Sequence, residues 1–322
     1  MGRFIIRRLL LMIPLTVGVT FLTFGLMNLI PGSPYTNLRS NPRIRPSDIA
    51  RLEEQLGLNR PWPVRYVEWL GDLLQGDLGR SMQNQVPVID RISAVLPNTL
   101  LLTTTALIFS LVIAVPLGVY AAARHRSWFD RGTNLATVAL WAIPNAWLAI
   151  MLVVLFSFKF KEWGLPSLPA TGITSPRGGG DLMDRIKHLI LPTISLGLIQ
   201  IGIWSAYIRS SMLEALHSDF IRTARAKGLA NRAVLFSHAF RNAFLPLVTL
   251  VGLSIPSLFG GAILIESVFA WNGMGLLALQ AVEQRDYTLV MGTTLMFAVL
   301  TMLANLIADV LYGVLDPRVR VD

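Results

Sequence analysis

The chain of 322 residues contains no cysteine, which excludes disulfide bridges, thiolate metal sites and a cysteine nucleophile. Charge is also scarce. Only 15% of the residues are Asp, Glu, Lys or Arg, whereas soluble domains carry about 25%. Together with 53% hydrophobic residues and a mean hydropathy of +0.56, this composition indicates an integral membrane protein.

The sequence also lacks a nucleotide-binding loop of the P-loop type, because no lysine is followed by serine or threonine. The glycine triplet at 178–180 has neither the spacing of a dinucleotide fingerprint nor a strand before it. The four histidines show no metal-ligand spacing. We therefore expect no catalytic residue, metal site or cofactor in this chain, which would not be an enzyme.

Long apolar stretches are present instead. A helix needs about 20 apolar residues to cross ~30 Å of hydrocarbon. The sequence therefore predicts an all-α membrane protein with six transmembrane helices, at Leu9–Ile30, Leu100–Ala123, Leu135–Phe158, Leu189–Ile208, Phe244–Ile265 and Leu289–Tyr312. The first stretch is longer than the core of a signal peptide and no cleavage site follows it, so we expect it to be retained.

The distribution of charge predicts the orientation. If the N-terminus is cytoplasmic, the cytoplasmic segments are 1–8, 124–134, 209–243 and 313–322, with 14 basic and 5 acidic residues. The outer segments carry 14 basic and 13 acidic residues, so nearly all of the net charge of +9 lies on one side. This bias is typical of cytoplasmic loops, and it predicts that both termini are cytoplasmic without any role for nucleic acid.

The spans divide the chain into four parts. These are the N-terminus with the first span (1–30), an outer-face cap (31–99), a transmembrane core (100–312) and a cytoplasmic tail (313–322). In the cap, the pattern predicts helices at Asp48–Leu56 and Pro63–Leu74. Its residues Trp62 and Trp69 could either anchor at the membrane interface or bind a partner protein.

The cytoplasmic segment 209–243 is the most informative one. We predict a short helix from Phe220 to Lys227, with Asp219 as its N-cap and Gly228 as the residue that ends it. Ala224 and Gly228 lie one turn apart and would leave a small, smooth face flanked by cations. Such a face suits docking onto another protein, but an ordinary positive loop explains the residues equally well.

Helix-breaking and ionisable residues mark the last two spans. Pro256, Gly260 and Gly261 make the fifth span a candidate for lining a translocation path, or for close packing alone. In the sixth span, Asn305 and Asp309 share a face, and we expect Asp309 to be paired or hydrated rather than to relay protons. Glu266 ends the fifth span, where we expect it to be solvated.

Short pieces along nearly the whole chain resemble those of one family in order and spacing. They are 4–10 (FIIRRLL), 30–34 (IPGSP), 56–58 (LGL), 76–79 (GDLG), 96–100 (LPNTL), 188–192 (HLILP), 222–229 (RTARAKGL), 241–243 (RNA), 285–287 (RDY) and 315–318 (LDPR). The chain resembles the B-type permease subunits of the dipeptide, oligopeptide and nickel importers driven by ATP-binding-cassette ATPases. One departure is Asn272, which stands where that family usually has proline.

The resemblance implies the type I importer permease fold and a pore for peptides in a bacterial or archaeal cytoplasmic (inner) membrane. It implies that the coupling helix, inserted in a groove of the ATPase subunit, consists of Arg222, Thr223, Ala224, Arg225, Ala226, Lys227, Gly228 and Leu229. It also implies four partners beside membrane lipid. These are a second homologous permease, two ATPase subunits that hold ATP and Mg, and an extracytoplasmic binding protein that could touch Trp62 and Trp69.

Two other functions stay open. The same architecture could carry nickel chelates, glutathione or another small solute. A proton-coupled secondary transporter is a more distant alternative, because Asp309 is the clearest ionisable residue within the spans and such transporters usually need several.

Overall fold

A computed structural model describes residues 2–29, 47, 51, 53, 54, 57, 59–176 and 180–315. Most of the predicted helix at 48–56 and most of the predicted tail lie outside these residues. The chain divides into two compact units. Unit 1 comprises Thr99–Asn272 with the chain from Leu303 onward, and unit 2 comprises Gly2–Asn98 and Gly273–Met302.

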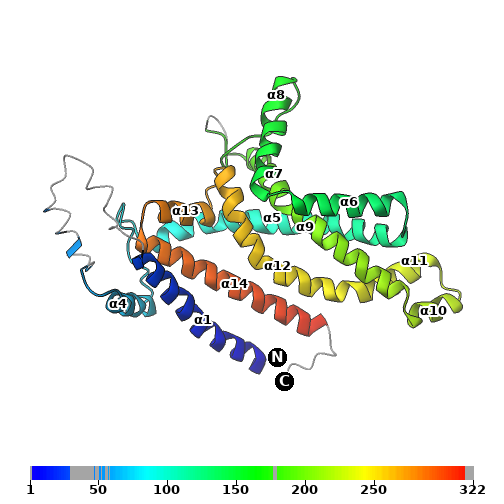
Figure 1. Ribbon diagram of the computed structural model, residues 1–322, viewed down its shortest axis with the longest axis horizontal. Helices are drawn as coiled ribbons and strands as arrows, with labels where there is room; N and C mark the ends of the chain where they lie inside the picture. The colour runs from blue at the N-terminus through cyan, green and yellow to red at the C-terminus, as the bar shows by residue number, and fades with distance from the viewer. Residues whose placement is uncertain are drawn as a thin grey trace. The chain divides into compact units, whose positions relative to one another are not determined.

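Five long helices overlap five of the six predicted spans (Figure 1). Within the described residues, each is long and apolar enough to cross a bilayer. They are α1 (Gly2–Leu29), α5 (Val88–Ala123), α9 (Leu182–Leu216), α12 (Arg241–Val268) and α14 (Tyr287–Leu315).

The third predicted span is not one straight helix. It consists of α6 (Trp128–Ala142), α7 (Asn145–Val153), the π-helix η1 (Val154–Lys159) and α8 (Phe160–Glu162). The two halves are bent by 101° at Pro144. Because proline disfavours a helical residue before it, Ile143 is extended, with ψ 126°. The span predicted at Leu135–Phe158 is therefore present as two helices with a sharp bend, and the described residues contain six spans when this bent pair is counted as one.

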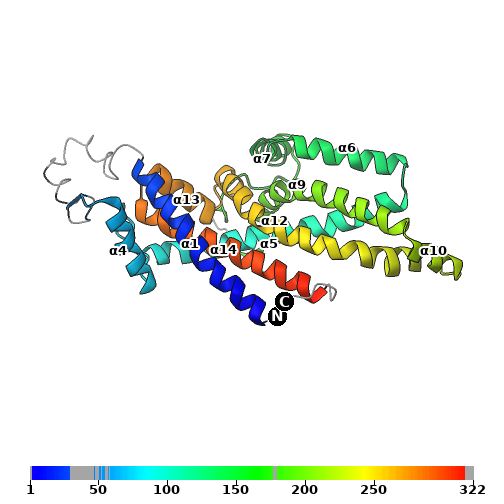
Figure 2. The ribbon, with the colours of Figure 1, turned by 60° about the horizontal axis from the view of Figure 1, so that its bottom comes forward.

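In unit 1, α9 is the central helix and contacts α6, α7 and α12 (Figures 1 and 2). Trp204 of α9 is fully buried. Two glycines allow α5 and α9 to lie close together. A Cβ atom at Gly118 would lie 2.7 Å from the Ile208 side chain, and one at Gly197 would lie 2.8 Å from Phe109. The close approach of these helices is typical of membrane proteins, in which small residues form the interfaces.

In unit 2, α4 (Trp62–Leu74) packs on α1 and confirms the helix predicted at 63–74. Tyr66 anchors this contact, since its hydroxyl lies 3.1 Å from that of Thr20 and donates to the Val17 carbonyl at 3.0 Å. The same unit contains α13 (Met274–Glu283).

The turn that leads into α5 is tied to the start of α14 by one carboxylate. Asp286 is fully buried and accepts a hydrogen bond from the Ser81 hydroxyl at 2.5 Å and another from the Met82 amide at 3.0 Å. The Leu289 amide also donates to it at 3.2 Å, so the same side chain caps α14. Asp286 therefore both holds the turn at Ser81 and Met82 and caps the N-terminus of α14.

Candidate functional site

The segment 209–243 forms a helical excursion between two long helices of unit 1. Helix α9 ends at Leu216, the short helix α10 (Asp219–Ala226) follows, and Gly228 has φ +76°, the left-handed conformation expected of it. The chain then returns through α11 (Asn231–Ala233) and the π-helix η2 (Val234–Phe240) into α12 (Figure 1). The predicted helix is confirmed, but it begins and ends one residue earlier than predicted, so Asp219 is its first residue and the prediction of Asp219 as the N-cap is wrong. The N-cap is Ser218, whose hydroxyl donates to the Ala215 carbonyl instead of capping α10.

Helix α10 has a buried face and an exposed face. Ile221 and Ala224 are 0% and 5% exposed and pack in one cluster with Met212 and Val234. Because residues three apart share a helix face, these two form the stripe that anchors α10 to α9 and η2. The predicted smooth outer face through Ala224 is therefore wrong, since Ala224 points into the protein.

The exposed face is cationic and has apolar ends. Phe220 and Leu229 are 44% and 41% exposed. Between them, the exposed residues are Arg222, Thr223, Arg225, Ala226, Lys227 and Gly228. Arg222 lies 3.4 Å from the Asp219 carboxylate, whereas no carboxylate in the described part of the chain pairs with Arg225 or Lys227. Seven of the eight residues predicted to contact an ATPase thus lie on the surface.

An ion pair that sequence analysis missed lies beside this segment. The Asp130 carboxylate is 2% exposed and accepts two hydrogen bonds from Arg209, through Nε and through Nη2, the latter at 2.8 Å. It also accepts the Arg126 amide at 2.8 Å, and His125 Nδ1 lies 3.3 Å from it. Such a bidentate pair has a fixed geometry. It therefore joins the first turn of α6 to α9 about two turns before α9 ends.

Sequence analysis could have indicated Asp130, but not its partner Arg209. Ser127 caps α6 by accepting the Asp130 amide at 3.2 Å, and an acidic residue three positions after a cap is a recognisable pattern. The partner, Arg209, is 79 residues away, and no local pattern indicates it.

The predicted translocation residues on α12 have different surroundings. Gly260 is exposed, and a Cβ atom added there would meet no other atom within 4 Å. A Cβ atom at Gly261 would lie 3.1 Å from Leu196 of α9, so Gly261 lies at a helix contact. Pro256 is half-buried within α12. Of the three, Gly260 alone is exposed, and the role of these residues in a path stays a prediction.

The two predicted residues on α14 do not join this group. Asn305 and Asp309 are half-buried, one turn apart. Gly252 of α12 lies against Ala308, so this part of α14 is level with Gly252. Gly260 follows eight residues later, which is about 12 Å along the helix. Gly260 and the two α14 residues therefore lie at different levels and do not form one site.

Glu266 contradicts the expectation that it is solvated. Its side chain is fully buried, and its carboxylate accepts a hydrogen bond from the Thr99 hydroxyl at 2.6 Å. The C-terminal end of α12 is covered by the part of α5 that carries Thr99. The position of a residue at the end of a span did not reveal this cover.

Trp62 and Trp69, the two tryptophans of the cap, differ in how deeply they are buried. Trp69 is 9% exposed, and its ring stacks on Tyr66 with centroids 6.1 Å apart. Trp62 is half-buried and lies 5.4 Å from the Phe21 ring of α1. Trp69 therefore offers little surface to a binding protein, and only the exposed part of Trp62 remains available for such docking.

The chain is similar to known transport proteins. Residues 114–321 match the family described as binding-protein-dependent transport system inner membrane component, and residues 1–103 match the N-terminal family of the same systems. The oligopeptide transport system permease protein AppB of Bacillus subtilis is 42% identical over 321 residues, 99% of this chain and 100% of that protein. The dipeptide transport system permease protein DppB of Escherichia coli K12 is 39% identical over 339 aligned positions, 99% of each chain.

Solved structures agree in fold. A chain of the inward-facing MetNI methionine ABC transporter aligns with a TM-score of 0.55 over 71% of this chain and 97% of its own length, at 15% identity. A second crystal form of that transporter gives 0.56 over 70% and 96%. At this identity, the likeness concerns the fold alone.

Proposed function

The chain belongs to the family of binding-protein-dependent transport system inner membrane components, and from this membership we propose that it forms one half of the pore of an ATP-driven importer of short peptides. The observation that carries the cargo is the identity of about 40% over the full length to relatives named for oligopeptides and dipeptides. A relative in Pseudomonas aeruginosa named for di- and tripeptides is 38% identical.

The family works with an ATPase and a substrate-binding protein. We infer that the complete importer contains this chain, a second homologous permease, two ATPase subunits that hold ATP and Mg, and one extracytoplasmic binding protein. In this proposal both termini and the segment 209–243 face the cytoplasm, as the excess of basic residues there favours.

Helix α10 is the proposed coupling helix. Its exposed cationic face between Phe220 and Leu229 suits contact with an ATPase, and its buried residues Ile221 and Ala224 connect that contact to the spans. A rigid-body movement of the ATPase would therefore reach α9 and α12 through packed side chains. For ATP to drive transport, the ATPase must bind the inward-open and outward-open pores with different affinity.

Uptake into proteoliposomes that contain the complete complex and the binding protein tests this function. We expect ATP-dependent accumulation of radiolabelled di- or oligopeptides. Accumulation of a nickel chelate or glutathione in place of peptides would leave the importer intact and refute the cargo. Uptake that continues without ATP and collapses with the proton gradient would instead support the secondary transporter.

Mass spectrometry of the small molecules retained by the cognate binding protein gives the length preference of the cargo. A series of short peptides is expected. A single defined compound of another class would contradict the peptide proposal even if transport required ATP.

A further inference from the structure

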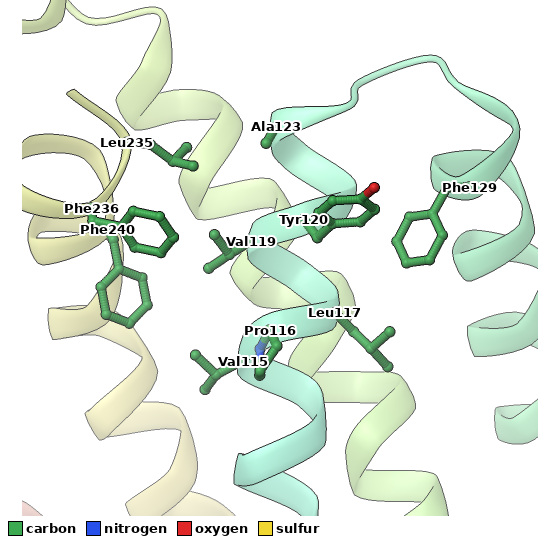
Figure 3. Close-up of a pocket in the computed structure, with 10 residues that line it drawn as sticks. All are labelled: Val115, Pro116, Leu117, Val119, Tyr120, Ala123, Phe129, Leu235, Phe236 and Phe240. Carbon is green, nitrogen blue, oxygen red and sulfur yellow. The ribbon is translucent and has the colours of Figure 1, made fainter. Parts of the chain in front are cut away.

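An apolar groove lies at one end of α5, outside the proposed coupling helix (222–229) and the predicted path residues (Figure 3). Its volume is about 500 Å³. Almost all of its wall is hydrocarbon, including four aromatic rings. The lining residues are Val115, Pro116, Leu117, Val119, Tyr120, Ala123, Phe129, Leu235, Phe236 and Phe240.

The groove is formed by three elements of unit 1. Residues 115–123 of α5 are its floor, Phe129 comes from the start of α6, and the three residues from 235 to 240 come from η2. Figure 3 shows Tyr120 and Phe129 together on one side of α5, with Phe236 and Phe240 on the other. Phe236 is 56% exposed, so the groove opens to the surroundings of the chain.

The groove ends where the apolar part of α5 ends. Ala123 is the last residue of α5, and the next three are Arg124, His125 and Arg126. In a membrane this step from hydrocarbon to cations corresponds to the boundary between acyl chains and headgroups.

A cation lies directly at this end. The Arg124 guanidinium carbon lies 4.7 Å from the centroid of the Tyr120 ring, which is part of the groove wall. Within the described ranges, no carboxylate pairs with Arg124, Arg126 or Arg131. The one acidic residue of segment 124–134, Asp130, already binds Arg209. The groove is thus an apolar slot with uncompensated positive charge at its polar end.

From this combination we infer that the groove binds one acyl chain of an anionic membrane phospholipid, whose phosphate contacts Arg124. An acyl chain matches the apolar wall, and the phosphate supplies the negative charge that the chain lacks there. A helix of the second permease could fill an apolar slot, but it would not by itself neutralise the cations. A short peptide carries an ammonium as well as a carboxylate end, and with its carboxylate at Arg124 the ammonium would lie among apolar side chains at a high desolvation cost.

The test uses the complete importer complex in nanodiscs of phosphatidylcholine with a few per cent of phosphatidylglycerol. A photo-reactive phosphatidylglycerol with a diazirine in its acyl chain is cross-linked, and the modified residues are mapped by mass spectrometry. We expect cross-links within 115–123 and 235–240, and we expect unlabelled phosphatidylglycerol to compete far better than phosphatidylcholine. This measurement needs no variant of the protein.

Variants test separately the contribution of the Arg124 charge and that of the apolar groove. Arg124→Gln should lower the retention of phosphatidylglycerol severalfold, Arg124→Lys should restore it, and Ala123→Trp should abolish cross-linking by filling the groove. Arg185→Gln removes an exposed cation near the N-terminus of α9, and it should change neither the retention of phosphatidylglycerol nor the cross-linking.

Two results would overturn the proposal. One is equal competition by the two lipids together with unchanged retention in Arg124→Gln. The other is the absence of cross-links from 115–123 and 235–240 in the complete complex, as expected if the second permease covers the groove.

Discussion

Asp130 is a buried carboxylate whose charge is balanced by one guanidinium, that of Arg209. We predict that Arg209→Gln leaves this charge without its partner and lowers the free energy of unfolding by on the order of 3 kcal/mol. Denaturation of the purified chain in detergent measures this loss. The double variant Asp130→Asn with Arg209→Gln should recover part of the stability, because neither charge then remains. A double variant no more stable than Arg209→Gln alone would contradict the assignment of the pair.

Gly118 is a second position at which one side chain decides the packing. A methyl group there would lie 2.7 Å from the Ser205 carbonyl oxygen, so Gly118→Ala should push α5 away from α9 and cost about 1–3 kcal/mol in unfolding free energy. Gly132→Ala is the matched control, because its new Cβ atom would meet nothing within 4 Å. This control should be neutral or gain about 0.5–1 kcal/mol, since glycine weakens a helix. Equal effects of the two changes would show that α5 and α9 are not in close contact there.

At the scale of single elements, the exposed face of α10 is proposed to dock the ATPase, whereas its buried face stabilises the fold. We predict that Arg225→Glu, on the exposed face, lowers ATP-driven uptake about tenfold, the equivalent of roughly 1.4 kcal/mol of docking free energy. Its thermal unfolding should stay unchanged, because the Arg225 side chain is exposed. Uptake and ATPase activity of the reconstituted complex measure the effect, with Arg185→Glu as the control. Normal uptake by Arg225→Glu would argue against α10 as the coupling helix.

The buried face of the same helix should behave in the opposite way. Ile221 is fully buried, so Ile221→Ala should cost about 2–4 kcal/mol in unfolding free energy. Substitutions at Ala224 and Gly228 are poorer tests of docking. Ala224→Arg would bury a charge, and Gly228→Trp would strain a backbone with φ +76°. A stability of Ile221→Ala equal to that of the unchanged chain would mean that α10 is not packed as described.

At the scale of the whole molecule, the absence of cysteine allows the proposed orientation to be measured directly. We predict that Gln75→Cys in the cap reacts with a membrane-impermeant maleimide on intact cells. Arg232→Cys, in the segment proposed to be cytoplasmic, should react only after the cells are permeabilised. Labelling of both cysteines from outside would reverse the orientation of one segment and with it the proposed site of ATPase docking.

The amino-acid sequence by itself determined the membrane class, the approximate positions of the spans, the short helix predicted at 220–227 to within one residue at each end, and the family. These features depend on local properties, namely the length of apolar runs, the capping residues and short motifs in order, and each can be recognised without knowledge of distant contacts. For the smooth face predicted at Ala224 and Gly228, the sequence was right about one residue and wrong about the other. Gly228 has the expected conformation, whereas Ala224 is buried because α9 and η2 pack against it.

Only the tertiary structure decided which side chains meet. The cover over Glu266, the pairing of Asp130 with Arg209 and the groove beside Arg124 all depend on elements that are distant in the chain. A transmembrane sequence is apolar on most sides, so its pattern does not show which face of a helix contacts protein and which contacts lipid. That choice is made when the helices pack, and the candidate sites of this protein follow from it.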